Sequence, residues 1–182
     1  MARISEKSER YRDKNELIRD LRKVLELDVH YGTKFAVLHE VAWVWTEFYG
    51  KYVGCPYWSE KALELYENRK SIPGFSCDKL LRHDHAVPRK IILKYFLSYR
   101  KVTEDCIRNI FEKVLVGSIL TKEENDVILK DTMPPPVNDK SIEKYLDTDK
   151  WARYRDKGIK IFKVEWQGKI RKKITGKESV SL

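Results

Sequence analysis

Two histidines flank a carboxylate at residues 83–85, where groups suited to metal or acid–base chemistry lie next to each other. On an extended segment successive side chains point to opposite faces, so His83 and His85 would share one face while Asp84 points to the other. Imidazole binds metals in its neutral form and exchanges protons near neutral pH. We therefore treat His83, Asp84 and His85 as a candidate site for a divalent metal such as Mg²⁺ or Zn²⁺.

The stretch Asp84-His85-Ala86-Val87-Pro88 resembles the D-H-x-x-P signature of the HNH (ββα-metal) nucleases. That resemblance would make Asp84 a metal ligand and His85 the general base that activates the attacking water. The family also needs a second hairpin strand and then a helix with an asparagine and a further histidine. Here helical sequence begins directly after Pro88, and no histidine follows His85. We expect a function without catalysis and keep a metal-dependent nuclease as the alternative.

Other metal ligands could come from elsewhere in the chain. His39 could join the cluster from a helix, since a metal site needs three or four converging ligands. Cys55 and Cys77 could complete a zinc site with the histidines, or they could be buried thiols. The three cysteines include no C-x-x-C pair, which favours reduced thiols over a disulfide framework. The sequence also has no glycine-rich phosphate loop, so we expect no nucleotide cofactor.

Basic side chains in the last fifth of the chain form the second candidate site. Thirteen Lys and Arg stand against five Asp and Glu between residues 140 and 177, whereas residues 1–139 carry 24 against 22. Such a segregated basic segment suits a polyanion, and aromatic faces within it can stack on unpaired bases. The candidate nucleic-acid contacts are Arg153, Tyr154, Arg155, Lys160, Lys163, Trp166, Lys169, Arg171, Lys172 and Lys173.

This segment predicts a protein that binds nucleic acid, or a protein already bound to nucleic acid, through phosphates. Inhibition of a nucleoprotein enzyme falls within the same class. A plainer interpretation makes the aromatics a hairpin core and the lysines an ordinary charged surface. A third hypothesis places a protein interface on the tryptophan-rich residues 43–58.

The helices that position these groups are predicted by apolar spacing. Apolar residues recur at helical intervals over residues 17–25, and residues 34–49 are apolar on most sides, so an amphipathic helix should precede a buried one. Further helices are expected over residues 89–99 and after the capping residues Ser59, Thr103 and Thr121.

Prolines 134–136 divide the chain, because they forbid helix and remove three backbone donors. The segments on either side differ in charge and in pattern. We expect a helical core domain at 1–133, a proline-rich linker at 134–139, a basic appendage at 140–177 and a tail at 178–182.

The appendage combines a helix and a hairpin. Residues 142–155 could form the helix, and the alternating runs 159–166 and 169–174 predict two antiparallel strands. The expected fold class is therefore α+β, a mostly α-helical core with a C-terminal basic β-hairpin.

Composition limits the remaining possibilities. A chain of 182 residues with 42% hydrophobic residues can build a core. No run approaches the roughly 18 apolar residues of a membrane span, and the charged N-terminus lacks an apolar signal core, so we expect a cytoplasmic protein without a membrane partner. The pattern also loosely resembles small uncharacterised proteins of bacterial and phage genomes. That resemblance rests on residues 83–88, 120–125, 133–134, 153–154 and 158–159.

Overall fold

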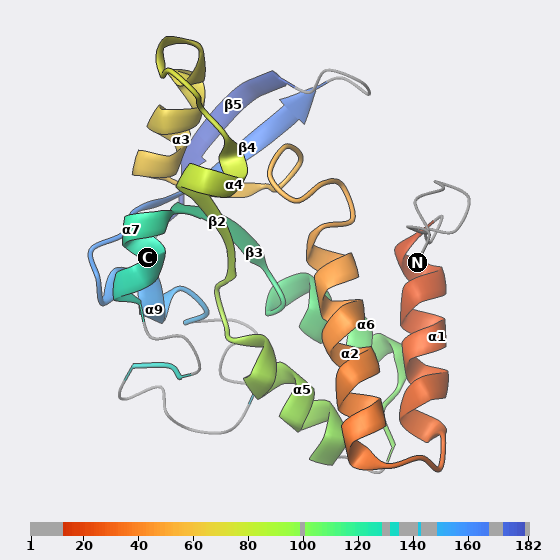
Figure 1. Cartoon of the computed structure of the whole chain (residues 1–182). Helices are drawn as coiled ribbons and strands as arrows, with labels where there is room; N and C mark the ends of the chain where they lie inside the picture. Colours follow the sequence, from red (N-terminus) through yellow and green to blue (C-terminus); the bar gives the residue numbers. More distant parts are fainter. Residues whose placement is uncertain are drawn as a thin grey trace.

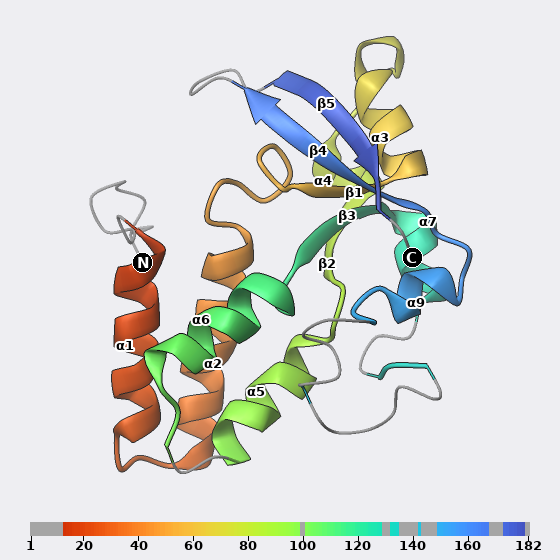
Figure 2. The same ribbon diagram turned by 180° about the vertical axis from the view of Figure 1, so that it is seen from behind.

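Helices that bury apolar side chains pack together and form the largest part of the core (Figures 1 and 2). The layer consists of α1 (Lys14–Glu26), α2 (Tyr31–Thr46), α5 (Arg89–Ser98) and α6 (Glu104–Lys113). The computed structural model of the chain describes residues 13–98, 101–128, 132–134, 142, 149–167 and 173–180.

The predicted amphipathic helix is α1, and its start is fixed by a side-chain cap. The Asp13 carboxylate accepts hydrogen bonds from the backbone N–H groups of Asn15 and Glu16 at 2.7 and 2.9 Å, which satisfies two donors that the first turn would leave unpaired. Helical spacing then places one apolar stripe inward. The buried residues of α1 are Leu17, Ile18 and Leu21.

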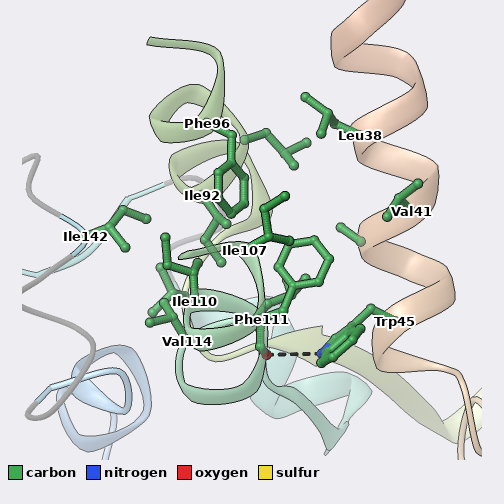
Figure 3. Close-up of a cluster of buried hydrophobic side chains, with 14 of the residues drawn as sticks. Leu38, Val41, Trp45, Ile92, Phe96, Ile107, Ile110, Phe111, Val114 and Ile142 are labelled. Atoms are coloured by element: carbon green, nitrogen blue, oxygen red, sulfur yellow. Dashed lines mark hydrogen bonds between the residues drawn. The ribbon is translucent and has the colours of Figure 1, made fainter. Parts of the chain in front are cut away.

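Helix α2 begins three residues earlier than the apolar spacing predicts. The His30 ring accepts a hydrogen bond from the Gly32 N–H at 3.1 Å and so acts as the N-cap. At the other end of α2, the Trp45 indole donates to the Phe111 carbonyl at 3.0 Å, which links α2 to α6 across the cluster (Figure 3). This buried indole therefore has its polar group satisfied.

A five-stranded mixed sheet lies beside the helical layer (Figures 1 and 2). Its order is β2-β3-β1-β4-β5; β1 and β3 run parallel, and the other neighbours run antiparallel. The sheet and the helices confirm the α+β class. The strands are β1 (Tyr57–Ser59), β2 (Leu81–His85), β3 (Gly117–Thr121), β4 (Ile161–Gln167) and β5 (Lys173–Ser179).

The two faces of the sheet bury two separate apolar clusters. Ile119 and its neighbour Leu120 on β3 alternate between them. Helix α3 (Glu60–Glu67) packs on the Ile119 face, and α9 (Ala152–Arg155) packs on the Leu120 face. The other short helices in the described part of the chain are α4 (Cys77–Leu80), the 3-10 helix η2 (Arg69–Ser71) and α7 (Lys122–Val127).

A capping box opens α7, as the sequence predicts. The Thr121 hydroxyl accepts from the Glu124 N–H, and the Glu124 carboxylate accepts from the Thr121 N–H. The same carboxylate also accepts from the Ser59 hydroxyl, and that hydroxyl caps α3. The buried Glu124 therefore joins the starts of two helices and has a structural role.

The predicted hairpin is present, and its second strand extends past the predicted end at residue 174. Strands β4 and β5 pair antiparallel, and β5 covers Lys173–Ser179, while residues 169–172 of the predicted strand lie outside the described residues. Strand β4 also pairs with β1, from Tyr57 opposite Lys163 to Ser59 opposite Ile161. Residues 140–177 thus contribute β4 and most of β5 to a sheet whose other strands precede the prolines. Residues 135–139 of the predicted linker lie outside the described residues.

Within the described residues, no helix has the length and apolar character needed to cross a lipid bilayer.

Candidate functional site

The two histidines lie side by side on β2, and the alternation predicted from the sequence is confirmed. His83 pairs in register with Ile119, and His85 pairs with Gly117. The two imidazole centroids are 5.2 Å apart, with the rings nearly perpendicular. Asp84 points to the opposite face of the sheet, where it contacts α9. The candidate triad is therefore divided between two environments.

His83 lies in a closed environment between α2 and β3. None of its side chain is exposed, and neither ring nitrogen has a hydrogen-bond partner among the described residues. Its Nδ1 is 4.0 Å from Glu47 Oε1. On the other side the ring approaches Gly117 so closely that a Cβ there would lie 2.4 Å from Nε2. Burial, with smaller effects from Lys51 and Arg89, lowers the pKa of His83 to about 3.

The ring of His85 has one polar partner among the described residues. Its Nε2 lies 3.1 Å from the Thr46 hydroxyl on α2. Burial lowers the pKa of His85 well below the usual value, and the neighbouring His83 and Arg89 contribute in the same direction. Both imidazoles are therefore neutral at physiological pH, which is the form that binds metals.

Trp43 and Arg89 complete the histidine cluster. The Trp43 ring lies 5.3 Å from the His83 ring and 5.0 Å from the His85 ring. The Arg89 guanidinium, at the start of α5, is 4.0 Å from the centre of the Trp43 ring, a cation–π contact. His39 is half-buried, and its pKa is lowered by burial and by Arg89. The cluster is thus closed on one side by an aromatic ring and a cation.

Asp84 is held by α9 on the other face. Its Oδ2 accepts from Arg153 Nη1 at 3.2 Å and from the Tyr154 hydroxyl at 2.9 Å. The same Arg153 Nη1 donates to the His85 carbonyl at 2.7 Å. Burial raises the pKa of Asp84, while Arg153 and Tyr154 oppose that shift. The carboxylate is therefore engaged in a buried network that ties α9 to β2.

This arrangement separates the groups that the HNH resemblance assigns to one centre, because Asp84 and His85 face opposite sides of the sheet. No group of three His, Cys, Asp or Glu side chains is placed to hold a metal ion within the described residues. Cys55 is buried, and burial raises the pKa of its thiol to about 12; Cys77 lies on α4. The divalent metal stays a prediction from the sequence.

Two of the predicted nucleic-acid contacts are buried. Arg153 is 2% exposed and Tyr154 is fully buried, and both point to Asp84. Both side chains are therefore engaged inside the chain, and phosphate contact by Arg153 and base stacking by Tyr154 stay predictions that this packing does not favour. The physical reason is that α9 packs on the sheet, so its inward side chains meet β2.

Trp166 on β4 is half-buried in the cluster under α3. Its indole donates to the Cys55 carbonyl at 2.7 Å, and the Trp58 indole donates to the same carbonyl at 2.9 Å. The Trp166 ring also packs 5.9 Å from the rings of Trp58 and Tyr66. The plainer interpretation, an aromatic hairpin core, describes this residue.

Three of the predicted contacts keep their charges on the surface. Arg155, Lys160 and Lys163 are exposed. Arg155 pairs with Asp149 at 2.6 Å, and Lys160 pairs with Glu60 at 3.4 Å. Lys169, Arg171 and Lys172 lie outside the described residues, and Lys173 is described by its backbone in β5 alone.

Sequence reasoning missed the residues of α2 and α5 that enclose the histidines. Trp43, Thr46 and Glu47 have the i, i+3, i+4 spacing of one helix face, which was a usable signal for a common surface. Nothing in the spacing indicates that β2 lies against that face. Gly117 was also missed, because its role depends on the approach of a side chain from the neighbouring strand.

No protein-family model, curated protein or solved structure matches the chain.

Proposed function

We propose that the protein binds nucleic acid, free or within a nucleoprotein, through the phosphate backbone and without catalysis. The observation that supports this function is the segregation of charge: between residues 140 and 177 Lys and Arg exceed Asp and Glu by eight, while the whole chain has a net charge of +9. Electrostatic attraction acts over a long range, and a polyanion is the kind of partner that such a basic segment attracts. The three free cysteines are in keeping with a cytoplasmic location.

The exposed cations can exchange their carboxylate partners for phosphates. Arg155 and Lys160 are held by single carboxylates at the surface, and such pairs contribute about 0–1 kcal/mol each. Lys163 stands opposite Glu178 in the β4–β5 pairing. A phosphate can therefore replace these carboxylates at small cost. Tyr154 and Trp166 are engaged in packing. We therefore expect the exposed cations to contact phosphates, and we expect no base stacking by these two rings.

The test is a binding titration by fluorescence anisotropy with labelled single- and double-stranded DNA and RNA over a series of salt concentrations. The logarithm of the binding constant should fall linearly with the logarithm of salt concentration, by about 0.9 per phosphate contact on duplex DNA. A variant carrying Arg155→Gln, Lys160→Gln and Lys163→Gln should bind more weakly and with a shallower salt slope.

The matched control removes three charges elsewhere. Arg19→Gln, Lys23→Gln and Lys70→Gln change exposed cations outside the C-terminal segment and give the same net charge. Equal weakening by the two triple variants would show attraction to net charge without a site. No binding to any of the four polymers at low salt would refute the proposal.

The nuclease alternative is tested on the same samples with Mg²⁺, Mn²⁺ or EDTA. We expect no cleavage, because the imidazoles are buried and Asp84 is engaged by Arg153. Cleavage that requires the metal and is lost in His85→Ala would favour the nuclease.

A further inference from the structure

Exposed apolar side chains gather where α1 and α2 are joined. Leu27, Val29 and Tyr31 retain 52%, 42% and 53% of their surface, although they lie within five consecutive residues. The join lies at the opposite end of the molecule from the β4–β5 hairpin (Figures 1 and 2). Large apolar side chains that cluster on a surface mark an interaction site.

A hollow of about 680 Å³ opens beside these residues. It lies between the end of α1, the start of α2 and residues 101–103, which precede α6. Leu25, Leu27 and Val102 supply apolar lining. An exposed apolar projection and a hollow are therefore adjacent on one surface.

Most of the polar groups that line the hollow are engaged within the chain. Arg22 pairs with Glu26 at 3.1 Å, and Lys34 donates to the Leu25 carbonyl at 2.9 Å. The Thr103 hydroxyl accepts from the backbone of α6. These groups have little capacity left to orient a small polar ligand.

Asp28 and Lys101 are different. Both line the hollow, and neither has an ion pair or hydrogen bond to any part of the chain that the structure describes. They carry opposite charges. A polyanion would be repelled by Asp28, and a polycation would be repelled by Lys101.

We propose that this surface joins two copies of the chain about a twofold axis. In such an interface the same patch is used twice, and residue i contacts residue j in both directions. Val29 and Tyr31 of each copy would lie against the hollow of the other, and Asp28 of each copy would pair with Lys101 of the other. The patch carries two opposite charges and an apolar projection beside a hollow. It can therefore be complementary to the same patch on a second copy.

The proposal does not depend on nucleic-acid binding. It would nevertheless place the two hairpins at the outer ends of the dimer, where both could contact one long polymer and so increase avidity.

The test is sedimentation velocity over a dilution series of the full chain in the absence of nucleic acid. We expect a concentration-dependent dimer for the native chain and a monomer for Val29→Asp. Val127→Asp is the matched control, because Val127 is 58% exposed on α7, outside the patch. Circular dichroism melts should show that both variants are folded.

Charge reversal gives a second and independent measurement. Asp28→Lys and Lys101→Asp should each raise the dimer dissociation constant by about tenfold or more, because each disturbs two contacts in a twofold dimer. The double variant should restore dimerisation. A native chain that is monomeric at about 100 μM, or a double variant that is weaker than both single variants, would overturn the proposal. Capture of a peptide or small molecule by a monomeric native chain would overturn it as well.

Discussion

Replacing Arg153 by methionine tests whether this guanidinium maintains the fold or contacts a ligand. Arg153 Nη1 is 3.2 Å from Asp84 Oδ2, it also donates to the His85 carbonyl, and only 1% of the side chain is exposed. Methionine retains much of the apolar stem but removes the charge. The Asp84 carboxylate then loses its cation while it stays buried against α9.

The size of the loss in the free energy of unfolding depends on how deeply Asp84, the partner that remains, is buried. Removing one member of a buried ion pair typically lowers the free energy of unfolding by about 3–5 kcal/mol. Asp84 keeps 19% of its side chain exposed and retains the Tyr154 hydroxyl as a donor. We therefore expect a loss near the lower limit, about 3 kcal/mol.

Arg155 is the matched control, two residues further along the chain. Its side chain is 47% exposed and pairs with Asp149 at the surface. Such a pair contributes about 0.2–1 kcal/mol, so Arg155→Met should change the free energy of unfolding by less than 1 kcal/mol. Asp84→Asn combined with Arg153→Met should recover part of the loss, because the unpaired charge is then removed.

The assay is urea unfolding at pH 7, followed by far-ultraviolet circular dichroism. A loss below about 1 kcal/mol for Arg153→Met, or a loss equal to that of Arg155→Met, would refute the argument that Arg153 acts through the buried pair. If the folded Arg153→Met protein had unchanged stability but bound nucleic acid more weakly, Arg153 would instead be assigned to the nucleic-acid-binding surface.

Three further predictions follow from the packing of the sheet. Gly117→Ala should lower the free energy of unfolding by about 1–3 kcal/mol, because its Cβ would lie 2.4 Å from His83 Nε2. His83→Ala in the same chain should recover most of that loss. An unchanged urea midpoint for the Gly117→Ala variant would contradict this prediction. Lowering the pH from 7 to 4 should reduce the free energy of unfolding, because burial lowers the pKa of His83 to about 3 and the pKa of His85 well below its usual value, so both histidines take up protons more readily in the unfolded chain, near pH 6.5, than in the folded protein. The slope should reach at most about 1.4 kcal/mol per pH unit for each histidine, and a His83→Gln/His85→Gln variant with the same slope would exclude this cause. Trp166→Leu should lower the melting temperature through lost packing and loss of the 2.7 Å hydrogen bond to the Cys55 carbonyl, while leaving the nucleic-acid affinity of the folded protein unchanged in anisotropy titrations; a weaker affinity would identify the ring as a stacking surface.

Local patterns predicted α1, α2, α3, α5, α6 and α7 and one strand pair, but not α4 or η2, and of the helix predicted over residues 142–155 the described residues show Ala152–Arg155. The apolar stripe of α1 and the capping box of α7 are both set by residues within a turn or two of each other, so they are readable from sequence. Strand β3 was missed because all five of its residues, Gly117–Thr121, are buried. A strand covered on both faces has no polar alternation to reveal it. Strand β1 is three residues long, too short to show a period.

The sequence by itself determined that His83 and His85 share a face opposite Asp84, because alternation along a strand is a property of the backbone. It also determined where the charge lies. Only the tertiary structure decided which cations are available, because Arg153 and Arg155 have the same chemistry and nearly the same position in the chain. The pairing of β4 with β1 brings α9 onto the sheet, so Arg153 meets a carboxylate 69 residues away while Arg155 faces solvent. The burial of Arg153 depends on contacts between distant segments, and the residue spacing within α9 does not specify them.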